Sequence, residues 1–75
     1  MEIRWPMIEV FKTNVECPDK AKELVNLLLY HFPGNRINFD MHDCDKVLRV
    51  EGKNFIPGKV IAIVTENGFA CNILE

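Results

Sequence analysis

The sequence predicts a single α+β domain in which two βαβ units share one sheet. Two observations carry this prediction. Short alternating apolar stretches, typical of strands, flank two longer stretches whose apolar residues recur at helical spacing. Each helical stretch begins at a proline and ends at a turn containing glycine, and the order of elements is strand, helix, strand, strand, helix, strand. Because 75 residues suit one domain, residues 1–75 are expected to form one unit.

The first strand is predicted at Met7–Thr13, after an irregular lead-in of residues 1–6 that contains a proline. We expect Ile8 and Val10 to face the core and Phe11 to face the other side of the sheet. This assignment places Lys12 on the core side, where only a snorkelling side chain or a bulge would accommodate it.

The first helix is predicted to begin at Pro18, with Cys17 at the N-cap position, and to stop at Pro33–Gly34. Its apolar residues fall at i, i+3, i+4, i+7 and i+11, which is the pattern of one buried stripe. The stripe consists of Ala21, Leu24, Val25, Leu28 and Phe32.

The second half repeats the pattern, with a polar hairpin turn between its first two strands. The predicted elements are a strand at Ile37–Met41, a turn at residues 42–45, a strand at Val47–Glu51, a helix from Pro57 to a cap at Asn67–Gly68, and a strand at Phe69–Leu74.

Right-handed crossovers then give a ferredoxin-like βαββαβ sandwich. The four-stranded antiparallel sheet has the order 4-1-3-2, and both helices cover one face. This topology gathers three loops at one end, and they bring His42, Cys44 and Cys71 to the same end as Cys17.

Composition excludes several classes of function. A net charge of −2 and a pI of about 5.6 argue against nucleic-acid binding, and the longest apolar run is too short to cross a membrane. Three cysteines make no disulfide framework, and the lead-in has no apolar signal core, so we expect reduced thiols in the cytoplasm. The chain has no serine, no phosphate-binding glycine loop and no nucleophile–base pair, so no enzymatic activity is expected.

The stretch Asn14–Lys20 joins the first strand to the first helix, and with it the chain resembles the heavy-metal-associated domain family of copper chaperones and metal-pumping ATPases. That family carries Gly-Met-x-Cys-x-x-Cys here. Asn14 stands at the glycine, Val15 at the methionine, Cys17 at the first cysteine and Lys20 at the second. The resemblance covers residues 7–75 and implies the fold, but the chelating pair is reduced to one thiol.

What the resemblance implies for function is a degenerate metal-binding module. Copper(I) or zinc would bind through Cys17, with Cys44 and His42 as further candidate ligands. The charge of Lys20 would repel a cation and favour a thiolate. Cys17 is therefore a remnant at a helix start, a reactive thiol, or one ligand of a site that another chain completes.

Two alternatives carry no metal. One is a protein-interaction or self-associating module, whose partner binds the open sheet face, where Met7, Phe11, Val47 and Leu74 are expected to place apolar atoms. The other is a thiol redox sensor based on Cys17. Neither requires nucleic acid or a membrane.

Overall fold

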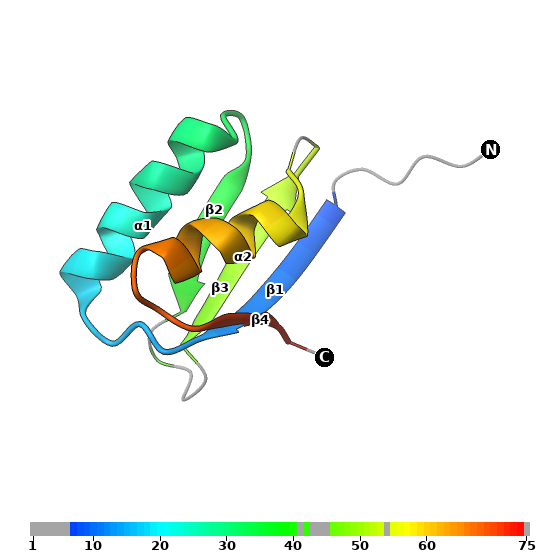
Figure 1. Ribbon diagram of the computed structural model, residues 1–75. Coiled ribbons are helices and arrows are strands. Elements are labelled where there is room, and N and C mark those ends of the chain that lie inside the picture. The colour runs from blue at the N-terminus through cyan, green and yellow to red at the C-terminus, as the bar shows by residue number, and fades with distance from the viewer. Residues whose placement is uncertain (1–6, 41, 43–45, 54, 75) are drawn as a thin grey trace.

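The computed structural model describes residues 7–40, 42, 46–53 and 55–74. Within them the chain forms the predicted βαββαβ order (Figure 1). The elements are β1 Met7–Thr13, α1 Pro18–His31, β2 Arg36–Asp40, β3 Val47–Gly52, α2 Pro57–Glu66 and β4 Cys71–Ile73.

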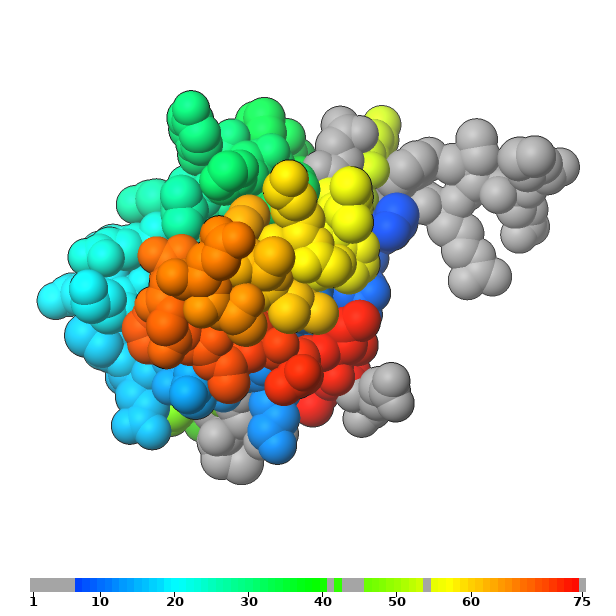
Figure 2. All heavy atoms as spheres, in the orientation of Figure 1, coloured from blue at the N-terminus to red at the C-terminus, as the bar shows by residue number. Residues whose placement is uncertain are grey.

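The strands form one antiparallel sheet in the order β2-β3-β1-β4. This is the predicted order 4-1-3-2 counted from the opposite edge. Both helices lie over the same face of the sheet (Figure 1), and in the space-filling view they hide most of it (Figure 2). β4 is shorter than the predicted Phe69–Leu74, and its three residues pair with Phe11–Thr13 of β1.

The core lies between the helices and the sheet. Phe11 of β1 pairs with Leu48 of β3, and both side chains are fully buried with Leu28 of α1 and Val64 of α2. The predicted stripe of α1 faces this core, with only Val25 of its five residues half-buried.

The predicted orientation of β1 is wrong. Phe11 faces the helices, whereas Ile8 is 58% exposed and lies with Val10 on the open face. Cross-strand partners share a face, and Phe11 is paired with the buried Leu48, so the register leaves no other choice. The same orientation turns Lys12 away from the core, which removes the difficulty that the sequence assignment created.

The helix ends agree with their sequence signals. Cys17 and Ile56 are the N-caps, each followed by a proline at the first helical position. Asn67 caps α2, and Gly68 follows with a φ of +92°, a conformation that glycine adopts without steric cost. Among the described residues, no helix has the length and apolar character that crossing a membrane requires.

Candidate functional site

The loop between β1 and α1 is fixed by hydrogen bonds to two other loops. The Thr13 hydroxyl donates to the carbonyl of Lys46 at 2.6 Å, and Asn14 Oδ1 accepts the backbone N–H of Ala70 at 2.8 Å. Val15 is fully buried, and its N–H lies 3.3 Å from Thr13 Oγ1. The loop is thereby tied to the segment before β3 and to the turn before β4. Sequence reasoning assigned Asn14 only to a degenerate motif and missed this bond.

Cys17 is exposed where this loop enters α1. Its extended backbone (φ −91°, ψ 120°) is that of an N-cap, and its carbonyl accepts the Ala21 N–H at 2.9 Å. The thiol makes no capping hydrogen bond. Cys17 thus starts the helix through its backbone and leaves its sulfur open to reagents from solution.

The side chain of Lys20 forms an ion pair within α1. Its Nζ lies 3.6 Å from Glu23 Oε1 on the next turn of α1, and both side chains are largely exposed. Such a surface pair contributes well under about 1 kcal/mol. Both residues border a hollow of about 310 Å³ between α1 and the turn before β4, lined further by Leu27 and Phe69. The effect that Lys20 was expected to have on the Cys17 thiol stays a prediction.

The structure describes two of the other three residues that the topology was expected to bring to the end of the domain near Cys17. His42 is exposed in the turn after β2, where its N–H donates to Asp40 Oδ1 at 3.1 Å. Cys44 lies outside the described residues. Cys71 is 3% exposed, and burial raises the pKa of its thiol from 9.0 to about 11. Cys71 is therefore protonated at neutral pH and faces the core.

The residues that the structure describes do not fit a resident copper or zinc ion. They contain no group of three or more histidine, cysteine, aspartate or glutamate side chains that could hold a metal. Zinc sites use three or four such ligands, and a transferable copper(I) site uses two thiolates. Within this part of one chain, only Cys17 presents an exposed thiol.

The helices leave the other face of the sheet open (Figure 1). Its side chains form rows across the strands, with apolar residues on β1 and charged residues towards β2. These rows are Ile8–Glu51–Arg36, Val10–Arg49–Asn38 and Lys12–Val47–Asp40. Of the four apolar residues predicted here, Met7 and Phe11 lie on the helix side, Val47 is buried, and Leu74 is half-buried beside Val10.

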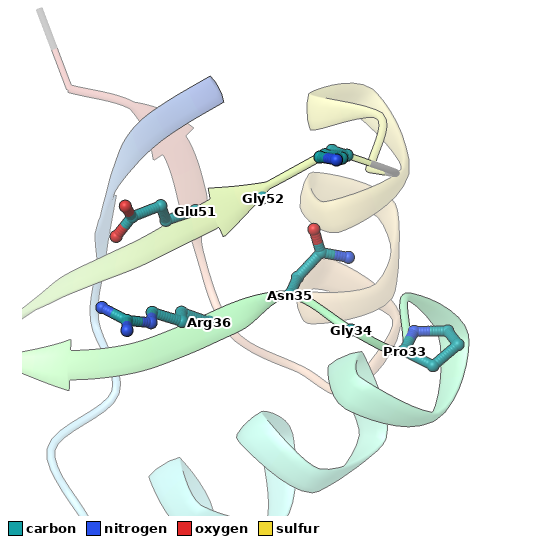
Figure 3. Close-up of a pocket in the computed structure, with 7 residues that line it drawn as sticks. Pro33, Gly34, Asn35, Arg36, Glu51 and Gly52 are labelled. Carbon is teal, nitrogen blue, oxygen red and sulfur yellow. The ribbon is translucent and has the colours of Figure 1, made fainter. Parts of the chain in front are cut away.

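A second hollow, of about 540 Å³, lies where α1 meets β2 and β3 ends, lined by residues 33–36 and 51–53 (Figure 3). The Asn35 side chain points towards Gly52, and its Nδ2 donates to the Phe32 carbonyl at 2.8 Å. Arg36 and Glu51 extend side by side from paired strands. The residues that line this hollow include no serine, threonine, cysteine or histidine.

Neither protein-family models nor curated proteins nor solved structures provide a match to this chain. The resemblance to the heavy-metal-associated family therefore stays a prediction from the sequence. Among the described residues, two features can support a function: the open face of the sheet and the exposed thiol of Cys17.

Proposed function

We propose that this chain is a non-enzymatic protein-interaction module that binds its partner through the open face of its sheet. In this proposal the heavy-metal-associated type of fold is retained while its chelating motif is lost. The observation that carries the proposal is the exposure of Ile8, the second residue of β1, on the same face as the half-buried Val10 and Leu74. An apolar patch rimmed by charge on a rigid sheet is typical of a binding surface.

The charges on this face favour a protein over a nucleic acid as partner. Arg36 and Arg49 alternate with Glu51 and Asp40, so the face has no field of one sign. A surface that binds phosphate backbones concentrates lysine and arginine. A folded protein with an apolar patch and charges of both signs complements this pattern.

The test compares two variants, each of which carries glutamate in place of one exposed isoleucine. Ile8→Glu places a charge in the patch, whereas Ile56→Glu alters an equally apolar residue, 64% exposed, at the start of α2. Each immobilised variant is incubated with an extract of the cells that make the protein, and retained proteins are quantified by mass spectrometry. A partner retained by wild type and Ile56→Glu but lost with Ile8→Glu is expected. If no protein distinguishes the two variants, the open face is not the binding surface.

A second candidate rests on the exposed thiol of Cys17. Because one thiol does not chelate, a soft metal such as copper(I) would be held only with a ligand from another chain. Competition against a calibrated copper(I) chelator under reducing conditions tests this function in wild type and Cys17→Ala. Competition that disappears in the variant is the expected result, whereas no competition by wild type would eliminate this function.

A further inference from the structure

β2 lies at the edge of the sheet, and its backbone is directed in a way that prepares it for another strand. The N–H of Leu74 donates to the carbonyl of Val10 at 2.9 Å, so the even-numbered residues of β1 point their backbone groups towards β4 and the odd-numbered ones towards β3. The partners of these odd-numbered residues are the even-numbered residues of β3, so the odd-numbered residues of β3 point their backbone groups towards β2. Their partners on β2 are Arg36, Asn38 and Asp40, which therefore point towards β3. The N–H and C=O groups of Ile37 and Phe39, which lie between them, point outward from the sheet. Among the described residues no strand pairs with that edge.

The sequence of β2 is complementary to itself when two copies run antiparallel. A two-fold axis through Asn38 places Ile37 opposite Phe39 of a second copy, and these are the residues whose backbone groups point outward. The same axis places Arg36 opposite Asp40 of the second copy, at both ends of the paired region. These are non-hydrogen-bonded positions, where opposing side chains approach most closely, with Cα atoms about 4.5 Å apart.

The charges of this edge favour pairing. Proteins protect an exposed edge from association with charged side chains, especially lysine, or with proline. Here Arg36 and Asp40 are both exposed and opposite in sign, so two copies attract where two lysines would repel. Asp40 Oδ1 accepts the His42 N–H, and a carboxylate retains further acceptor sites for an arginine.

The helix side of the same edge carries apolar side chains that a second copy would bury. Phe39 is half-buried and packs on the core. Val25 and Leu29 are half-buried and stand one turn apart on α1. Leu27 lines the hollow between α1 and the turn before β4. Val25 and Leu29 lie about 200° around the helix axis from Leu27. They therefore occupy the flank of α1 that faces away from α2, above the β2 edge.

We propose that two copies of this chain associate by antiparallel pairing of their β2 edges. The product is a continuous eight-stranded sheet with four helices on one face. Because the two-fold axis is perpendicular to the sheet, both open faces lie on the same side of this dimer. The pairing leaves Ile8 and Val10 uncovered, so this inference stands independently of the proposed function.

Charge reversal with complementation tests the pairing by sedimentation velocity, from about 10 µM to 1 mM, the range for a small interface. Wild type is expected to approach twice its mass of 8.7 kDa as the concentration rises. Asp40→Arg and Arg36→Asp each place like charges opposite one another and should weaken the dimer about 10-fold or more. An equimolar mixture of the two variants restores both oppositely charged pairs and should dimerise. Lys59→Asp, on the exposed surface of α2, is the charge-reversal control and should leave the dimer intact.

Cysteine crosslinking tests the position of the axis. In a Cys17→Ser, Cys44→Ser background, Asn38→Cys places two thiols across the two-fold axis at a separation that a disulfide spans. Mild oxidation should give a covalent dimer, whereas Arg49→Cys, opposite Asn38 but one strand inward, should stay monomeric. A wild-type chain that remains at 8.7 kDa up to about 1 mM would overturn the proposal. So would a dimer unaffected by both charge reversals, or crosslinking equal at both positions.

Discussion

The junction between α1 and the end of β3 gives the sharpest test of the packing. A Cβ atom added at Gly52 would lie 1.7 Å from Asn35 Oδ1 and 2.6 Å from Asn35 Cγ, far inside contact distance. The φ of Gly52, 158°, is also one that residues with a Cβ rarely adopt, so backbone strain adds to the close approach. We predict that Gly52→Ala forces the buried Asn35 side chain out of its position and breaks its bond to the Phe32 carbonyl.

The expected loss of unfolding free energy in Gly52→Ala is the sum of two costs. Overpacking of a filled site costs about 1–3 kcal/mol, and losing a buried hydrogen bond costs about 1–3 kcal/mol more. A total of about 2–6 kcal/mol is a large part of the stability of a domain this small, about 4–11 kcal/mol. Urea unfolding followed by circular dichroism at 222 nm measures it. Gly58→Ala is the matched control, because its added Cβ meets nothing within 4 Å in α2, and it should stabilise by about 0.5–1 kcal/mol.

A double-mutant cycle separates the clash from other effects. Asn35→Ala removes both atoms nearest to the added methyl and leaves only Asn35 Cβ, at 3.0 Å. We expect Gly52→Ala to cost at least about 1 kcal/mol less in this background than in wild type, so the coupling energy exceeds about 1 kcal/mol. An equal cost in both backgrounds would refute the clash as the cause. A Gly52→Ala protein within about 0.5 kcal/mol of wild type would show that Asn35 is not held in place.

Three further predictions concern the cysteines and the loop after β1. In a Cys44→Ser background, Cys17 should react rapidly with a thiol reagent while Cys71 reacts only after unfolding; equal rates would contradict the burial of Cys71. Because burial raises the pKa of Cys71 to about 11, its contribution to stability is complete below about pH 9 and is lost as the pH rises towards 11. Between about pH 9 and 11, the unfolding free energy of wild type should fall by at most about 2–3 kcal/mol more than that of Cys71→Ala. Parallel curves for the two proteins would count against a raised pKa of Cys71. Asn14→Ala removes the acceptor for the Ala70 N–H and should cost about 1 kcal/mol in urea unfolding, whereas Asn14→Asp keeps an acceptor and should lose less; identical losses would exclude the bond.

Local signals in the sequence determined the elements and their order. Cys17 and Pro18 mark the start of α1, and Asn67–Gly68 marks the end of α2, because caps depend on the conformation of a few adjacent residues. The sheet order follows from these elements and the handedness of crossovers. Of the candidate site, the sequence identified Cys17 at the helix start.

Only the tertiary structure decided which face of β1 is buried. Met7 and Phe11 compete there with Ile8 and Val10, so alternation is equally satisfied by both faces, and only the pairing of Phe11 with Leu48 selects one. The bond between Asn14 and Ala70 joins residues 56 positions apart, and no local pattern encodes it. Which backbone groups of β2 point outward likewise depends on the hydrogen-bonding registers of β1 with β3 and of β3 with β2. These registers exist only once the sheet has formed.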